Sequence, residues 1–259
     1  AVFPMTLLVI GALTSVNYRG VVGALTLNFV ITMIAFIAII VFFFSSTIGG
    51  IVELNSVELW SQGAMPKGLI GLFAALQFGP WFYLGIEGAA MSAEECDKPS
   101  RAVPLGQQAG MISLLVVAAM TLFYCSSILP ANELGASVYP QWEVARESGV
   151  GFLIVLMGIG TLLTCLASAN GTICDSSRSW YALAKDDYVA KWFSAIHPYY
   201  RSPYRSVIFT MPIAIAFAFS GYLDQVITFS IISGLLCYVL IPFSLIRFRK
   251  MFPDSIATD

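Results

Sequence analysis

Long stretches of this chain contain none of the four charged residue types Asp, Glu, Lys and Arg. These charge-free runs cover residues 1–18, 20–52, 68–86, 102–132, 148–174, 206–223 and 225–246. An apolar helix needs roughly 20 residues to cross the hydrocarbon core of a bilayer, and each run is close to that length or longer. Apolar and polar residues do not alternate along the runs, as they would in the strands of a membrane barrel. The pattern therefore predicts an all-α integral membrane protein with seven transmembrane helices.

The seven predicted helices lie mostly within these runs. Their expected bounds are Val2–Val16, Val21–Phe44, Gly68–Ala93, Gln107–Leu129, Gly149–Cys174, Ser206–Tyr222 and Gln225–Ile246. The segments 45–67 and 130–147 contain Pro, Gly, Ser and Asn, which are typical of turns, so both are predicted to be exposed connections.

The composition excludes several classes of protein. Of the 259 residues, 58% are hydrophobic and 11% are charged, whereas soluble domains average about 45–50% and about 25%. The net charge of −2 gives no sign of a nucleic-acid partner. Neither the five cysteines nor the single histidine shows the spacing of a metal site, so no metal and no cofactor is expected. The partners that remain are the lipid bilayer and a small molecule.

The positions of Lys and Arg predict how the helices are oriented. In membrane proteins these residues gather in the cytoplasmic loops. If the N-terminus of the first span lies outside, 11 of the 13 basic residues lie inside and only two, Lys67 and Arg146, lie outside. The opposite orientation inverts this ratio. We therefore expect a multi-pass membrane protein with the chain's N-terminus outside and its C-terminus in the cytoplasm. The plasma membrane is its expected location, although the charge pattern itself does not distinguish one membrane from another.

The third predicted span contains the features of an interrupted helix. Pro80 removes a helical N–H group, and Gly85 and Gly88 make the following turn easy to unwind. Between the two glycines lies Glu87, the only Asp, Glu, Lys or Arg within any predicted span. A carboxyl group within a membrane usually marks the path of an ion, a proton or a substrate. The alternative is a carboxyl group at the membrane edge that reaches the cytoplasm beside Glu94 and Glu95.

Four segments of the chain, in order, resemble one family of transporters. They are Asn17–Gly20; Trp81–Glu95 with Lys98-Pro99, Arg101 and Pro104; Ala169–Pro203 with Ser177-Arg178, Tyr181–Asp187 and His197-Pro198; and Phe229–Phe252 ending in Arg247–Lys250. Together they resemble the amino acid–polyamine–organocation (APC) permeases, and within them the branch of ethanolamine and amino acid permeases. The resemblance extends along essentially the whole chain.

The resemblance implies a partial leucine-transporter-type fold with inverted repeats of five helices. The seven spans then correspond to helices four to ten of the family. Residues 1–259 form one transmembrane domain, in which 1–48 end the first repeat and 68–248 form the second. On this expectation Ala1 lies within the fourth helix. The family's broken first helix and its last two helices are then absent from the chain.

The resemblance also implies where a substrate binds. In the family, the backbone at the break of the sixth helix contacts the substrate amine, which implicates Gly85, Ile86 and Gly88. Trp81 matches an aromatic residue that packs on the substrate, although ordinary helix packing explains it equally well. Glu87 matches a residue implicated in proton sensing or coupling.

The eighth helix of the family flanks the substrate cavity. In this chain it carries Ser168, Asn170 and Thr172, of which Asn170 is a candidate for substrate binding and the other two for coupling. Polar residues at these positions also form hydrogen bonds between membrane helices. Some proton-coupled relatives carry a lysine in the fifth helix, but the matching span Val21–Phe44 has no basic residue. A proton through Glu87, a sodium ion, and exchange without net coupling all remain open.

The predicted function is secondary active transport of an amino acid or a small amine such as ethanolamine, by alternating access and without catalysis. A seven-span receptor is the alternative, but the sequence motifs of such receptors are missing. An enzyme within the membrane is disfavoured because the polar residues do not converge on a catalytic set. More hydrophobic spans in the parent reading frame would separate a transporter from a receptor.

Overall fold

The computed structural model describes residues 2–48, 67–76, 78–91, 93, 96–137 and 139–252. Within these ranges the chain is helical and forms no strand, which confirms the predicted all-α class. The elements are α1 (Val2–Tyr18), α2 (Val21–Ile48), α4 (Gly68–Leu76), α5 (Phe78–Trp81), α6 (Gly88–Met91), α7 (Pro99–Ile128), α8 (Ala131–Ala136), α9 (Pro140–Glu147), α10 (Gly151–Lys185), the 3-10 helix η2 (Lys191–Ser194), α11 (Tyr204–Ser220) and α12 (Leu223–Met251).

Four helices in the described part of the chain are long and apolar enough to cross a membrane. Their apolar stretches are Val22–Ser45, Pro99–Ile128, Gly151–Lys185 and Gln225–Met251. The other three predicted spans fall on the 17-residue helices α1 and α11 and on the interrupted segment α4–α6. The figure of seven membrane crossings therefore stays a prediction.

Three long helices extend beyond the charge-free runs that predicted them, and one of these is α12, which continues past Ile246 to Met251. Helix α7 begins at Pro99, ahead of the expected Gln107, with a proline in its first turn, where the missing N–H has no helical partner in any case. Helix α10 continues past Cys174 to Lys185 and so contains Asp175. A loss of apolar character marks the edge of a membrane, but it does not end the backbone hydrogen bonding of a helix.

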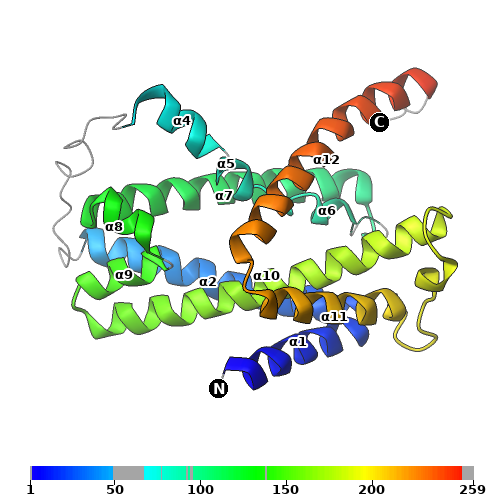
Figure 1. Ribbon diagram of the computed structural model, residues 1–259, viewed down its shortest axis with the longest axis horizontal. Helices are drawn as coiled ribbons and strands as arrows, with labels where there is room; N and C mark the ends of the chain where they lie inside the picture. Colours follow the sequence, from blue (N-terminus) through cyan, green and yellow to red (C-terminus); the bar gives the residue numbers. More distant parts are fainter. Residues whose placement is uncertain are drawn as a thin grey trace.

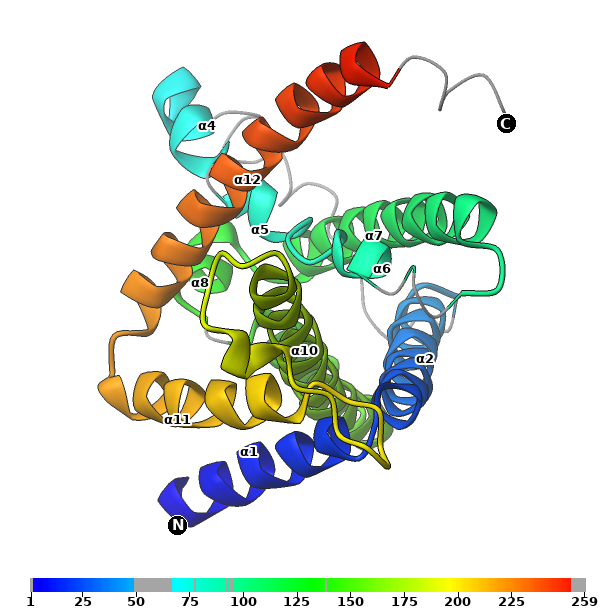
Figure 2. The ribbon, with the colours of Figure 1, turned by 90° about the vertical axis from the view of Figure 1, so that its right-hand side faces the viewer.

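Helix α10 is the centre of the arrangement. It lies side by side with α2 and also packs against α1, α11 and η2 (Figure 1). Helix α12 extends away from this group, as the turned view shows (Figure 2). Among the described elements, α12 packs chiefly against α11 and α5. The short elements α5 and α6 lie between α12 and α10, so the interrupted segment is contacted from both sides.

The main buried cluster joins α2, α7, α9 and α10. It contains Phe42, Tyr124, Val144, Leu153 and Met157, each 4% exposed or less. The segment 130–147 was predicted to be an exposed connection, and that prediction is wrong for α9. Val144 and its neighbour Ala145 are completely buried, because α9 turns this apolar pair toward α7 and α10. The segment 45–67 is described only at 45–48 and at Lys67, so its predicted loop lies mostly outside the described residues.

Large apolar side chains cover much of the surface. On α12, Leu236, Leu240 and Phe243 are between 60% and 66% exposed. Soluble monomers rarely show contiguous apolar surface on this scale. These side chains therefore suit contact with lipid or with further apolar helices rather than with water.

Candidate functional site

The third predicted span is interrupted where its proline and glycines predict. Helix α5 ends at Trp81, turns occupy residues 82–87, and the short helix α6 begins at Gly88. In the turns, backbone N–H groups bond carbonyls three residues earlier, as from Tyr83 to Pro80 at 3.0 Å and from Gly88 to Gly85 at 3.0 Å. Gly85 has a φ of 97°, a conformation that residues with a side chain rarely adopt. The backbone is thereby opened beside Glu87.

The carboxylate of Glu87 lies in the opened turn and has two hydrogen-bond donors. Its Oε2 accepts the backbone N–H of Gly85 at 3.1 Å and lies 2.7 Å from the hydroxyl oxygen of Tyr238 on α12. The Tyr238 hydroxyl also lies 3.0 Å from the carbonyl oxygen of Tyr83. Glu87 is half-buried. The acidic neighbours Glu94 and Glu95 lie outside the described residues.

Glu87 can keep its hydrogen bond to Tyr238 both when it is ionised and when it is protonated. When Glu87 is ionised, the Tyr238 hydroxyl donates to the carboxylate. When Glu87 is protonated, it can donate to the Tyr238 oxygen while Tyr238 donates to the carbonyl of Tyr83, since a hydroxyl both donates and accepts. Both states keep Glu87 hydrogen-bonded. The arrangement is therefore chemically suited to carrying a proton.

A cavity of about 190 Å³ lies between the opened turn, α2 and α10. Its polar lining residues are Asn28, Asn170 and Asp175, and Gly85 and Gly88 of the opened turn also line it. Its remaining lining residues are Ala24, Leu25, Ala89, Gly171 and Cys174. Amide and carboxylate oxygens facing an exposed backbone form a surface that can accept hydrogen bonds from an ammonium group.

Asp175 reaches the opened turn because Gly88 has no side chain. A Cβ atom at Gly88 would collide with the carboxylate of Asp175. Asp175 is half-buried and interacts electrostatically with Arg178 on its own helix and with Glu87 across the turn. The site thus holds two carboxylates from different elements.

Asn170 joins three helices through its side chain. Its Oδ1 accepts the side-chain N–H of Asn17 at 2.8 Å, and its Nδ2 donates to the carbonyl of Ala24 at 3.0 Å and to Oδ1 of Asn28 at 3.3 Å. Only 1% of Asn170 is exposed. Asn170 therefore makes the interhelical hydrogen bonds that were the alternative to substrate binding, and it also lines the cavity.

The other predicted site residues lie in different surroundings. Ile86 is half-buried, and its carbonyl accepts a hydrogen bond from the Gln107 side chain at 3.4 Å. Trp81 is 44% exposed at the end of α5. Ser168 and Thr172 are exposed on α10, where the Thr172 hydroxyl donates to the Ser168 carbonyl at 2.9 Å. The structure brings Gly85, Gly88 and Asn170 to the lining of one cavity. The other predicted site residues are not among its lining residues: Trp81, Ile86, Glu87, Ser168 and Thr172.

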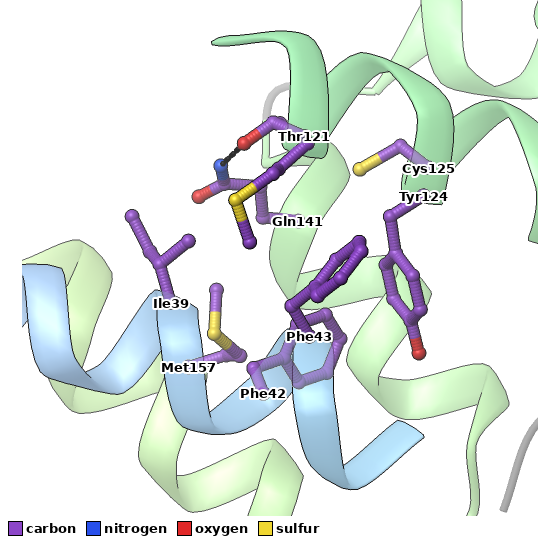
Figure 3. A pocket seen from close by; sticks show the side chains of 9 residues that line it. Ile39, Phe42, Phe43, Thr121, Tyr124, Cys125, Gln141 and Met157 are labelled. Carbon is purple, nitrogen blue, oxygen red and sulfur yellow. Dashed lines mark hydrogen bonds between the residues drawn. The ribbon is translucent and has the colours of Figure 1, made fainter. Parts of the chain in front are cut away.

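A second cavity, between α2, α7, α9 and α10, is apolar and small (Figure 3). Its volume of about 20 Å³ holds roughly one water molecule. Phe42, Phe43 and Met157 surround it, and its polar pair, Gln141 and Thr121, is joined by a hydrogen bond of 3.1 Å. This cavity is a packing gap within the main buried cluster and offers no room for a substrate.

Comparison with known proteins supplies the family. The sequence profile described as "Amino acid permease" matches residues 2–255. The chain belongs to the amino acid permease family. This confirms the predicted resemblance to the APC superfamily, and it does not favour the alternative of a seven-span receptor.

Several relatives of this permease chain carry names that refer to transport. It is 44% identical to an uncharacterized transporter of Rhizobium meliloti, over 96% of this chain and 54% of the relative. It is 26% identical to an uncharacterized transporter of Mycobacterium tuberculosis, over 90% and 52%. It is 21% identical to a branched-chain amino acid permease of Bacillus subtilis, over 95% and 52%. The chain thus spans about half the length of these relatives.

Sequence reasoning missed three residues of this candidate site: Tyr238, Asp175 and Asn28, which lines the cavity from α2. Tyr238 stands in a charge-free run, where a tyrosine gives no sign that its hydroxyl meets an acid 151 residues earlier. Asp175 follows directly after such a run and was taken as its end. The signal that could have found Asp175 is its position one helical turn ahead of Arg178 and one turn beyond Gly171, on a helix with no breaker between them.

Proposed function

We propose that this permease is a secondary active transporter that moves an amino acid or a small amine, such as ethanolamine, by alternating access. The observation that carries the proposal is the Glu87 carboxylate in an interrupted helix, beside a cavity with a second carboxylate in its wall. Broken helices at membrane depth occur where the backbone lines a binding cavity in transporters. The family membership and the transport-related names of the relatives support the same function.

The cavity suits the amine end of such a substrate. Asp175 lines the cavity and Glu87 lies beside it, so both carboxylates can supply negative charge, and the opened turn brings the backbone of Gly85 and Gly88 to the lining, with Ile86 next to them in the chain. The Asn170 side chain forms part of the cavity lining, and its hydrogen bonds to α1 and α2 fix its position. Trp81, at the end of α5, would pack on the substrate when the broken helix closes. No catalytic step is part of this function.

We propose that a proton drives transport through Glu87. The Tyr238 hydroxyl keeps the carboxyl group hydrogen-bonded in both protonation states, so protonation changes the charge at the cavity while the turn stays in place. Ser168 and Thr172 are further candidates for coupling, with hydroxyl groups on the exposed face of α10. A sodium ion and exchange without net coupling are the alternatives that the test below separates.

The proposed setting is the plasma membrane, with seven crossings, the N-terminus of this chain outside and its C-terminus in the cytoplasm. The distribution of basic residues supports this orientation. The first two spans, 1–48, would end one inverted repeat, and 68–248 would form the other.

The test is uptake by the protein, expressed from its whole reading frame and reconstituted in liposomes. Labelled amino acids, branched-chain ones included, and ethanolamine are offered with an inward proton gradient, a sodium gradient or neither. We expect a proton gradient to stimulate uptake, and Glu87→Gln to reduce that stimulation about tenfold or more. Glu147→Gln makes the same chemical change at an exposed position and serves as the matched control.

The outcomes discriminate between the alternatives. Stimulation by sodium alone would keep the transporter and overturn coupling by protons through Glu87. Exchange that responds to neither gradient would overturn coupling altogether. No uptake of any candidate, in either direction, would contradict the proposed function.

A further inference from the structure

The cavity of the proposed transport site contains a side-chain hydrogen-bond donor on α2. It is the amide of Asn28, a half-buried residue that lines the cavity. We propose that Asn28 determines substrate specificity: its Nδ2 donates to an oxygen atom of the substrate, so the site selects amines with an oxygen on the second carbon from the nitrogen. Amino alcohols and α-amino acids share this N–C–C–O unit. The selection rests on the proposed transport function, because it names the substrate class of that same site.

The hydrogen bonds of Asn170 determine which end of the Asn28 amide faces the cavity. Asn170 donates from Nδ2 to the carbonyl of Ala24 at 3.0 Å and to Oδ1 of Asn28 at 3.3 Å. A carbonyl group only accepts, so it requires the nitrogen end of the Asn170 amide at this place. Asn28 must then present its oxygen to Asn170, because the reverse orientation would bring N–H donors against each other.

A further contact fixes Asn170 from its oxygen end. The Nδ2 of Asn17 donates to the carbonyl of Leu13 at 2.9 Å and to Oδ1 of Asn170 at 2.8 Å. Backbone carbonyls at both ends of this network, at Leu13 and Ala24, therefore set the direction of all three amides. The nitrogen and oxygen of an amide are nearly alike in shape, and hydrogen-bond networks of this kind distinguish them.

The Nδ2 atom of Asn28 lies beside Gly171, which also lines the cavity. A Cβ atom at Gly171 would be only 3.2 Å from this nitrogen. Within the described part of the chain, Oδ1 of Asn28 accepts from Asn170 and Nδ2 donates to no acceptor. The N–H groups of Asn170 are already engaged by Ala24 and Asn28. The amide donor that the cavity offers to a substrate is therefore that of Asn28.

The carboxylate proposed to contact the ammonium group lies one helical turn from this donor. Asp175 lines the same cavity and follows Gly171 by four residues on α10, about 6 Å along the helix axis. With a hydrogen bond of about 2.8–3.0 Å at each end, a nitrogen and an oxygen joined through two carbons can bridge this separation. Arg178, which interacts electrostatically with Asp175, is not among the lining residues of this cavity.

An amine without the oxygen atom leaves the Asn28 donor unpaired when it fills the cavity. A donor that loses its hydration and gains no acceptor destabilises the complex. Sites that hydrogen-bond a substrate oxygen therefore discriminate strongly against analogues that lack it. Carboxylates alone would accept any small alkylammonium ion. Asn28 thus supplies a discrimination that Asp175 and Glu87 do not.

The experiment compares two pairs of compounds that differ by the oxygen. Liposomes containing the protein, expressed from its whole reading frame, receive labelled ethanolamine or propylamine, and labelled leucine or isoamylamine. A methyl group replaces the hydroxyl in the first pair, and the carboxylate is missing in the second. In at least one pair, we expect the unmodified protein to take up the oxygen-bearing compound about tenfold faster at low concentration.

Replacing Asn28 should remove this preference. Asn28→Leu has a similar size and no donor, so we expect uptake of the preferred compound to fall about tenfold, while uptake of its paired amine changes less than about twofold. Asn17→Leu is the matched control, because it removes another side-chain partner of Asn170 and lies outside the cavity lining. It should change the uptake of both members of a pair equally.

The outcomes separate selection by Asn28 from a purely structural role. A preference in the ethanolamine pair assigns a hydroxyl group, and a preference in the leucine pair assigns a carboxylate. Equal uptake within both pairs by the unmodified protein would overturn the selection and leave transport standing. A folded Asn28→Leu variant that keeps the preference would also overturn it. Uptake of none of the four compounds would overturn transport and the selection together.

A second variant keeps the proposal testable if Asn28→Leu does not fold. Asn28→Thr keeps an oxygen that can accept from Asn170 and puts a methyl group in place of the nitrogen. It must also lose the preference, and a retained preference would overturn the role of Asn28.

Discussion

At the scale of single residues, the hydroxyl of Tyr238 has one proton and two acceptors within reach. It lies 2.7 Å from the Glu87 carboxylate and 3.0 Å from the Tyr83 carbonyl. The position of its proton therefore depends on the protonation state of Glu87. The Tyr238 hydroxyl therefore links the protonation state of Glu87 to a hydrogen bond with the backbone of the opened turn.

Replacing Tyr238 with phenylalanine tests this linkage with almost no change in shape. The substitution removes a hydrogen bond to a charged group, worth about 1.5–3 kcal/mol. We expect proton-stimulated uptake by Tyr238→Phe to fall about tenfold or more. Tyr188→Phe, at a position that is 79% exposed, is the control. A Tyr238→Phe variant with the uptake and pH profile of the unmodified protein would show that the hydroxyl has no part in coupling.

A site residue could be predicted from the sequence only where its type is rare in an apolar helix. Glu87 could be found because an acid within an apolar run is costly and rare. Gly85 and Gly88 could be found because two glycines three residues apart weaken a helix. Tyr238 and Asn28 could not be found, since such residues are common in membrane helices and only the folded chain brings them to Glu87 and Asn170.

At the scale of elements, the interrupted segment is contacted by neighbours on two sides. Gly234 and Tyr238, one turn apart on α12, meet Leu84 and Glu87 of the turns. On the other side Asp175 of α10 lies against Gly88. The opened turn is therefore held between α10 and α12.

A side chain at Gly88 should disturb this contact. The methyl group of Gly88→Ala would collide with the Asp175 carboxylate, so we expect a loss of about 1–3 kcal/mol in the free energy of unfolding. Gly106→Ala, on α7 with open space around it, should be neutral or stabilising. Thermal unfolding in detergent measures both. We expect the double variant Gly88→Ala with Asp175→Ala to recover part of the lost stability, because the colliding carboxylate is removed. No recovery would show that the collision with Asp175 is not the cause of the loss.

Helix positions were predictable to different degrees for physical reasons. The position of α2 follows from its apolar run, because a run long enough to cross the bilayer is also the length of the helix. The far end of α10 does not, because charged residues continue a helix as readily as apolar ones do. The burial of α9 was missed because Val144 and Ala145 are a short apolar pair among polar neighbours.

At the scale of the whole molecule, the apolar surface exceeds what the described helices can bury. Leu240 on α12 and Leu162 on α10 are 62% and 63% exposed. The chain spans about half the length of its relatives. Lipid and further helices of a longer transporter are both consistent with such a surface. The stability of these helices is therefore expected to depend on a membrane or a detergent.

The proposed orientation can be tested by labelling single cysteines. Glu143→Cys lies in the predicted outer segment, and Lys191→Cys lies in the predicted inner one. In a background without reactive native cysteines, a membrane-impermeant maleimide should label Glu143→Cys on intact cells. Lys191→Cys should react only after the membrane is permeabilised. The reverse pattern would invert the topology, and labelling of both on intact cells would contradict an odd number of crossings between them.

The hydrogen bonds of Asn170 have a consequence for the order in which the helices are assembled. The Ala24 carbonyl and the Asn170 side chain that bonds it are separated by 146 residues. At a synthesis rate of about 5–20 residues per second, α10 leaves the ribosome roughly 7–30 seconds after α2. During that interval Asn17 and Asn28 lie in apolar helices without their hydrogen bonds to Asn170. We therefore expect α1 and α2 to remain near the insertion machinery until α10 is made.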